Sequence, residues 1–274
     1  LEVVEAFTQK PDGRKFAVQP DQIKEQQERG SADAPMFQDT LVKVVIFPDV
    51  AVGDRLIIRS RTHRHTALFA QHFESLSNPT FHPTKQYTLV YDLPQSMPLY
   101  ADARGFKASD PVTMAGRTIY RWDNIPDKKA RIENGSVAYQ DYGQYLAVST
   151  FPDFKTFAQA YNARAKSRVT ADISQLPQTI TAHLVEPREK AIALNDWVRK
   201  NIRYVAVYVG AGSVVPNPVE TILANRYGDC KDHVALLESL LAAVGIESTP
   251  ALLNAENAYT LPKVPTLGVI NHAI

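Results

Sequence analysis

The stretch Asn225-Arg226-Tyr227-Gly228-Asp229-Cys230-Lys231-Asp232-His233 is the most informative part of this sequence, and it contains the single cysteine of the chain. Apolar residues follow it at helical spacing, namely Val234, Leu237, Leu241 and Val244. They predict a helix from about Cys230 to Val244 that Gly245 ends. The thiol then lies in the first turn, where aligned peptide dipoles favour a thiolate. This position is typical of a nucleophile, and a small buried side chain is the alternative interpretation of Cys230.

A reactive thiol needs a base, and the candidate is His272 on a strand predicted from Leu267 to Ile274. A structural histidine is the alternative there. His233 is nearer in sequence, but its place along the helix turns it away from Cys230, and we predict that it lies on the helix surface. Gly228 is expected to let the chain turn sharply and approach a ligand closely.

The residues around this stretch predict mixed helices and strands. One helix begins behind Pro152-Asp153 with an apolar face from Phe154 to Ala165, and a second runs from Pro187 to Ile202. Tyr204–Val209 and Thr249–Asn254 are expected to be short strands. Tyr204 is a candidate for the wall of the cleft, with a buried strand aromatic as the alternative.

The first half of the chain favours strands separated by turns. The predicted strands are Leu1–Gln9, Lys15–Gln19, Leu41–Phe47, Arg55–Arg61, Gln86–Tyr91, Arg117–Trp122 and Gln144–Ser149. The polar run Asp21–Gly30 is predicted to be a loop. Many short strands with frequent turns indicate an antiparallel β-sandwich. We therefore predict an α+β protein with a β-sandwich domain over residues 1–148 and a second domain over residues 149–274.

Composition excludes several classes of protein. The 274 residues are 45% hydrophobic and 22% charged, which is near the globular average, and the formal net charge is +1. This balance gives no reason to expect a nucleic-acid partner, and no apolar run approaches the length of a membrane-spanning helix. One cysteine excludes an internal disulfide framework. Leu1 and Ile274 both lie in strand-like patterns, so we expect both ends to be cuts within a longer protein.

Several motifs together resemble the bacterial transglutaminase-like superfamily. They are Arg203-Tyr204-Val205, Val215-Pro216-Asn217-Pro218, Arg226-Tyr227-Gly228-Asp229-Cys230-Lys231-Asp232 and Asn271-His272-Ala273-Ile274. The first half is similar to the uncharacterised β-domain that commonly precedes this module, through Ala6-Phe7-Thr8, Pro11-Asp12-Gly13-Arg14, Val45-Ile46-Phe47-Pro48 and Val52-Gly53-Asp54. The two resemblances cover nearly the whole chain.

The resemblance implies a papain-like α+β domain with Cys230 as nucleophile and His272 as general base and acid. The Asp of the family's triad would lie on the strand after the histidine, beyond Ile274. Asp229 and Asp232 match the motif, and we expect them to cap and brace the helix start. The backbone N–H of Cys230 is the first candidate for stabilising the oxyanion.

The chemistry expected is acyl transfer to water or to an amine, with no cofactor and with a protein or peptide as substrate. The alternative is a non-catalytic binding or scaffold module of the cell envelope that retains the fold. The resemblance also implies a bacterial periplasmic or envelope location. His63 and His65 would face one side of a strand as a metal pair does, with His72 and His82 nearby, but no third ligand has suitable spacing and we expect no metal site.

Overall fold

The structure, a computed structural model, describes residues 1–27, 41–65, 67–79, 84–126, 133–166, 171–205, 214–256 and 258–274. Contacts within the chain divide the protein into two compact units. One is made of Leu1–Thr66 with Val205–Val214, and the other of Ala67–Tyr204 with Val215–Ile274. The domain boundary predicted between residues 148 and 149 falls inside the second unit and stays a prediction.

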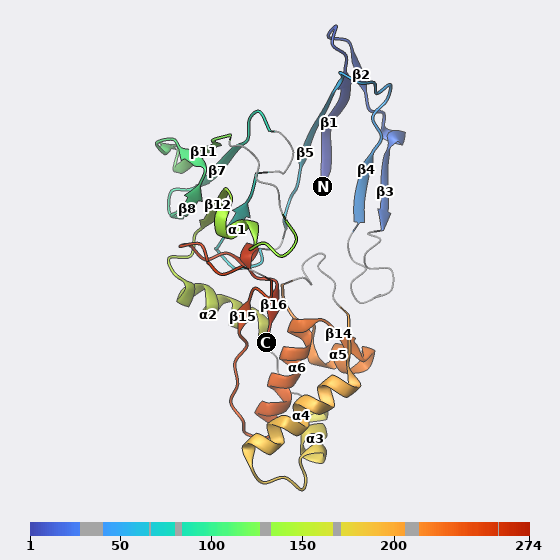
Figure 1. The fold of residues 1–274 in the computed structure, drawn as a ribbon, viewed down its shortest axis with the longest axis vertical. Helices are drawn as coiled ribbons and strands as arrows, with labels where there is room; N and C mark the ends of the chain where they lie inside the picture. The colour runs from blue at the N-terminus through green and yellow to red at the C-terminus, as the bar shows by residue number, and fades with distance from the viewer. Residues whose placement is uncertain are drawn as a thin grey trace. The chain divides into compact units, whose positions relative to one another are not determined.

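The first unit consists of two small antiparallel sheets (Figure 1). In one, β1 (Glu2–Gln9) lies between β2 (Lys15–Ala17) and β5 (Arg55–Arg61). In the other, β3 (Ile23–Gln27) follows the 3-10 turn η1 (Pro20–Gln22) and pairs with β4 (Leu41–Val45). The loop predicted over Asp21–Gly30 is therefore wrong for residues 23–27. Their polar sequence gives no alternation, and the strand forms because β4 supplies backbone partners.

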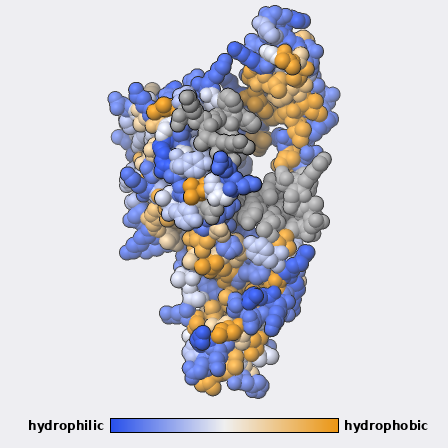
Figure 2. Space-filling model, in the orientation of Figure 1, coloured by the Kyte–Doolittle hydropathy of each residue, from blue (hydrophilic) through white to orange (hydrophobic). Residues whose placement is uncertain are grey.

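Apolar side chains remain on the surface of this unit, where they gather over its strands in Figure 2. Those that the structure leaves exposed include Leu41, Ile46, Val52, Leu56 and Ile58. Only a few of its side chains, such as Phe7 and Thr8, are fully covered. The unit thus buries a small share of its apolar area by itself.

The second unit begins with two antiparallel sheets. One contains β7 (Thr88–Pro94), β10 (Val112–Met114) and β11 (Arg117–Asn124), with β9 (Phe106–Ala108) also paired to β11. The other has the order β6 (Glu74–Ser77), β12 (Tyr145–Ser149), β8 (Tyr100–Arg104). Their inner faces share one apolar cluster, in which Trp122 of β11 and Phe106 of β9 meet Leu146 and Val148 of β12. The strands expected around residues 88, 117 and 145 are confirmed, and β6, β8, β9 and β10 were not predicted.

Strand β12 is buried on both faces, which makes it the centre of this region. Leu146 and Val148 face the other sheet, whereas Tyr145 and Ala147 pack with Val264 from the distant carboxyl-terminal part of the chain. Alternate side chains of a strand point to opposite faces, so one five-residue strand joins two layers.

The helices follow in the remainder of the chain. Their bounds are α1 (Tyr139–Tyr142), α2 (Phe154–Ala165), α3 (Ala171–Ile180), α4 (Pro187–Asn201), α5 (Val219–Asn225) and α6 (Cys230–Ala243). The helices expected near residues 154, 187 and 230 are confirmed. Helices α1, α3 and α5 were missed. The short helices α1 and α5 have only four and seven residues, and Pro177 inside α3 disfavours a helix although Ile173, Leu176 and Ile180 have helical spacing.

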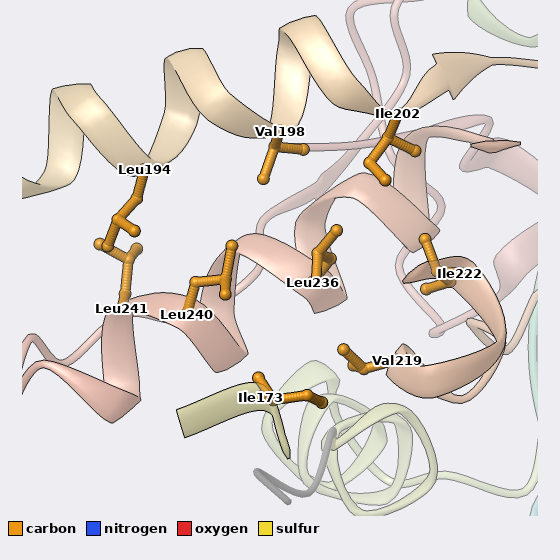
Figure 3. Packing of buried hydrophobic residues seen from close by; sticks show 9 residues of the cluster. All are labelled: Ile173, Leu194, Val198, Ile202, Val219, Ile222, Leu236, Leu240 and Leu241. Atoms are coloured by element: carbon orange, nitrogen blue, oxygen red, sulfur yellow. The ribbon is translucent and has the colours of Figure 1, made fainter. Parts of the chain in front are cut away.

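One apolar core joins α3, α4, α5 and α6. Figure 3 shows Leu194 and Val198 of α4 and Ile202 at its carboxyl end pointing toward α6, which contributes Leu236, Leu240 and Leu241. Ile222 and Val219 come from α5, and Ile173 comes from α3. This core holds α6, and therefore the residue at its first position, Cys230.

The short strands β13 (Arg203–Tyr204) and β14 (Tyr227–Gly228) pair in parallel, and β15 (Leu252–Leu253) pairs antiparallel with β16 (His272–Ala273). The predicted strand Leu267–Ile274 is thus shorter than expected, because Leu267–Val269 forms the 3-10 turn η5. Of the predicted strand Tyr204–Val209, residues 206–209 lie outside the described residues. The predicted α+β class is confirmed.

Candidate active site

Helix α6 begins with a capping box made by two aspartates. Asp229 is the N-cap, and its carboxylate accepts a hydrogen bond from the backbone N–H of Asp232 at 3.3 Å. The carboxylate of Asp232 accepts in return from the N–H of Asp229 at 3.4 Å. It also accepts from the backbone N–H of Asn217 at 2.7 Å, which joins the preceding loop to the helix start. The prediction that these aspartates cap and brace the helix is confirmed.

Lys231 forms an ion pair with Asp229 in the same turn, and both side chains are buried. Burial raises the pKa of Asp229, while the Lys231 ammonium acts in the opposite direction. Asp232 is fully buried as well. One cation therefore compensates part of the negative charge that two aspartates place beside Cys230.

Gly228 serves a different purpose from the one expected of it. Its backbone is not in the left-handed region, so no sharp turn requires a glycine here. A Cβ at this position would instead lie 2.6 Å from the Cβ of Asp232. Glycine is needed because β14 passes very close to the capping aspartate.

Tyr204 lies beside this segment, since β13 pairs it with Gly228. Its side chain is 50% exposed, so the alternative of a buried strand aromatic is wrong. Its ring centroid is 5.6 Å from that of His233. A role in the wall of a cleft stays a prediction.

The prediction that His233 lies on the helix surface is wrong. The ring is half-buried, and Nδ1 lies 2.8 Å from the carbonyl oxygen of Asp229 while Nε2 lies 3.1 Å from that of Ile202. Ile202 caps the carboxyl end of α4. His233 thus links the end of α4 to the start of α6, a contact that helical spacing alone does not reveal.

Cys230, the first residue of α6, has a free and partly buried thiol. Its amide belongs to the first turn, whose N–H groups have no carbonyl partner within the helix. Tyr161 of α2 is its electrostatic neighbour: burial raises the pKa of Tyr161 to about 12, and Cys230 and Asp229 add to the increase. The phenol therefore keeps its proton at neutral pH. The sequence assigned Tyr161 only to the apolar face of a helix and gave no sign that it approaches the thiol.

His272 lies on β16, which packs against α6. The next residue, Ala273, lines a small cavity together with Lys231 and Val234 of α6 and Tyr161 of α2. The fold therefore brings the strand that carries His272 against the first turns of the helix that carries Cys230. Among the described residues, no hydrogen bond joins the Cys230 thiol to the His272 ring.

Three acidic side chains hold the segment that leads to His272, which we term the 258–271 connection. Asp141 of α1 accepts from the backbone N–H groups of Tyr259 and Thr260, each at 2.9 Å, and from the Thr260 hydroxyl. Asp102 of β8 accepts from the N–H of Lys263 at 2.8 Å.

Glu74 of β6 completes the set. Its carboxylate accepts from the Thr266 hydroxyl at 2.5 Å and from the N–H of Leu267 at 3.0 Å. Val264 meanwhile packs on Tyr145 and Ala147 of β12. The β6-β12-β8 sheet therefore fixes the path of the chain into β16. Sequence reasoning missed these acids because their partners are backbone amides and threonine hydroxyls more than a hundred residues away.

The Asp141 contact predicts a dependence on pH. The Thr260 hydroxyl, with the two amides and nearby Arg104, holds the pKa of Asp141 below its ordinary value. The ionised Asp141 therefore stabilises the folded state fully above the ordinary carboxyl pKa, and this contribution is lost as the pH falls through the lowered pKa of Asp141. Asp141→Asn should therefore reduce the free energy of unfolding by about 1 kcal/mol near neutral pH, and the difference from wild type should shrink in acid. Urea unfolding at several pH values measures this.

Asp110→Asn is the matched control, because Asp110 is an exposed acid in the same unit. It should change stability by less than about 0.5 kcal/mol at any pH. An Asp141→Asn protein with wild-type stability at neutral pH would contradict the prediction.

The histidines of the first half do not form a metal cluster within the described part of the chain. His63 and His65 are exposed and lie just beyond β5, with ring centroids 6.4 Å apart. His72 instead stacks on Phe151 at 4.0 Å, and His82 lies outside the described residues. None of the described helices has the length and apolar character needed to cross a membrane.

Comparison with known proteins gives two family matches. Residues 1–127 match a domain of unknown function for which a structure has been solved, DUF3857, and residues 174–258 match the transglutaminase-like superfamily. The second range contains Cys230 and ends before β16. No curated protein matches the chain.

A crystal structure described as a "putative protease" from Parabacteroides distasonis aligns with 99% of this chain and 54% of its own, with a TM-score of 0.81 and 19% identity. At this identity the match shows the fold. The chain spans about half the length of that protein.

A second structure, described as a "putative cysteine protease" from Cytophaga hutchinsonii, covers 63% of this chain and 65% of its own at 14% identity. Its TM-score of 0.26 is too low to bear on the fold. The recognition made from the motifs is confirmed: the chain combines the DUF3857 domain with a following domain of the transglutaminase-like superfamily.

Proposed function

We propose that this protein is a cysteine-dependent acyl-transfer enzyme that hydrolyses an amide or peptide bond through a thioester. The observation that carries the proposal is the place of Cys230, a lone thiol at the first position of a 14-residue helix, with the strand of His272 packed on the same helix. A domain of the transglutaminase-like superfamily and a fold shared with a protein described as a "putative protease" add support.

In the proposed reaction, the thiolate of Cys230 attacks the substrate carbonyl carbon. His272 holds the thiol proton and passes it to the leaving amine as the carbon–nitrogen bond breaks, which leaves a thioester on Cys230. Water, deprotonated by His272, then attacks the thioester and releases the acid, and the thiol regains the proton. No cofactor is needed to balance these steps.

The helix start supplies the electrostatics of this proposal. Negative charge forms first on sulfur and then on the carbonyl oxygen, and both develop at the positive end of the α6 helix dipole. The N–H of Cys230 is the first oxyanion donor that we propose. The carboxylate of Asp229 already binds Lys231 and the helix N-terminus through the capping box, so we do not assign it the role of general base.

The test is the rate at which iodoacetamide alkylates Cys230 at about pH 6, where an ordinary cysteine is almost entirely the unreactive thiol. We expect alkylation about tenfold faster than that of a free cysteine, and a fall toward the ordinary rate in His272→Ala. Intact-mass measurement follows the reaction without a known substrate. His183→Ala is the matched control, because His183 is exposed beyond α3 and should leave the rate unchanged.

An ordinary rate in both the wild-type and the His272→Ala proteins would contradict the proposal. In that case Cys230 is structural, and a non-catalytic binding module becomes the better interpretation of the retained fold.

A further inference from the structure

A large pocket lies in the second unit between α2 and the carboxyl-terminal segments. Its volume is about 720 Å³, within the range of roughly 300–1,000 Å³ that ligand sites in proteins occupy. Phe154, Phe157 and Tyr161 line it from α2, and Leu253 of β15 and Ile270 line it from the facing side. We term it the α2 pocket.

The lining of the α2 pocket is mainly apolar. Among the described residues around it, Lys155 is the one charged side chain, and no carboxylate contributes. An acidic peptide would gain one ion pair at most, whereas an aromatic or long aliphatic side chain would exchange water for contact with the aromatic and aliphatic part of the lining. The chemistry of the walls therefore selects an apolar occupant.

The outer wall of the α2 pocket is held in place. Tyr259, Thr260 and Leu261 belong to it, and the Asp141 carboxylate fixes the backbone of the first two. Asn254 braces the other side, since its side-chain amide donates to the carbonyl of Val269 at 2.8 Å. Because these wall residues are already ordered, binding a side chain costs little additional conformational entropy.

The α2 pocket adjoins the small cavity at the first turns of α6. Tyr161 and Pro250 line both this pocket and the small cavity against the first turns of α6, which Lys231 and Ala273 also line. Tyr161 is the electrostatic neighbour of Cys230. Leu253 is the strand partner of His272. Lys231 and Ala273, the chain neighbours of Cys230 and His272, therefore lie across Tyr161 and Pro250 from this pocket.

We infer that the α2 pocket is a specificity site that takes a large apolar side chain, aromatic or long aliphatic, of a peptide substrate near the bond that Cys230 attacks. This inference rests on the proposed function and adds the class of substrate to it. Burial of a Phe side chain contributes roughly 1.5–3 kcal/mol, which corresponds to a preference of about ten- to a hundredfold over a small polar residue.

Dipeptidyl fluoromethyl ketones test the inference, because the thiolate displaces fluoride and labels Cys230 covalently. The probes carry Phe or Asn at either of their two positions, with Ala at the other, and the second-order labelling rate is read by intact mass. At one position, Phe should give a rate at least about tenfold above Asn.

Ala158→Trp should then remove the preference. Ala158 lines the pocket from the exposed side of α2, so the indole fills the pocket without entering the core. Ala163→Trp is the matched control, because Ala163 is exposed on the same helix and does not line the pocket. Ala163→Trp should keep both the wild-type preference for Phe and the wild-type iodoacetamide rate.

The outcomes separate this inference from the proposed function. Equal rates for Phe and Asn probes at both positions, or a preference that survives Ala158→Trp, would overturn the specificity site while a fast iodoacetamide reaction leaves the acyl-transfer proposal intact. A wild-type thiol that reacts with iodoacetamide at the ordinary rate overturns the acyl-transfer proposal, and the specificity site with it.

Discussion

Replacing Cys230 by serine should slow acylation of the protein by 4-nitrophenyl acetate by about a thousandfold or more. This activated ester accepts any strong nucleophile, so the measurement does not depend on the natural substrate. A serine hydroxyl at the start of α6 stays protonated and lacks the nucleophilicity of a thiolate. The wild-type protein should release a burst of 4-nitrophenolate equal to the protein concentration and gain the mass of one acetyl group, and the variant should do neither.

Because the chain has one cysteine, the control must show that position matters and not only the presence of a thiol. The double variant Cys230→Ser with Asn195→Cys places a thiol on the exposed face of α4. It should react at the slow rate of a simple thiol and give no burst. A burst that persists in Cys230→Ser would show that another group is the nucleophile.

Removing the carboxylate of Asp232 should produce the largest loss of stability near the site. Asp232 is fully buried, and it accepts from the backbone N–H groups of Asn217 and Asp229 and from the Asn217 amide. Asp232→Ala leaves these donors buried without an acceptor, so the free energy of unfolding should fall by roughly 3 kcal/mol. Urea unfolding at neutral pH measures the change.

Asp232→Asn is the matched control, because it keeps the shape and one acceptor oxygen. Its cost should be closer to about 1 kcal/mol. Asp232→Ala should also slow alkylation of Cys230, since the helix start then loses its cap, and the Asn variant should recover part of that rate. An alanine variant within about 0.5 kcal/mol of wild type would mean that Asp232 does not brace the helix start.

The local patterns of the chain were sufficient for several parts of the fold. Helical spacing from Val234 onward, with Asp229 as a cap, identified α6 and placed Cys230 at its start. The helix of residues 187–201 and the strands around β1, β5 and β11 were equally readable from their apolar residues, and β12 was readable as a short apolar run that is buried on both faces. The motif around Cys230 was specific enough for the superfamily to be recognised.

Other elements could not be predicted because their formation depends on partners elsewhere in the fold. The polar strand β3 exists because β4 pairs with it, and α3 forms with a proline inside it because α4 and α6 cover its apolar side chains. The sharp turn predicted at Gly228 and the surface position predicted for His233 were also wrong. Both depend on partners that lie across the fold, the Cβ of Asp232 and the carbonyl of Ile202.

The sequence by itself determined the nucleophile candidate, its helix cap and the superfamily, since these depend on residues that are neighbours along the chain. Only the tertiary structure decided that Tyr161 lies against the first turns of α6, that Glu74, Asp102 and Asp141 hold the 258–271 connection, and that α2 and β15 line a common pocket. The physical reason is that backbone amides and apolar walls carry no signal of their own in a sequence. They acquire a role only when folding places a distant carboxylate or side chain against them.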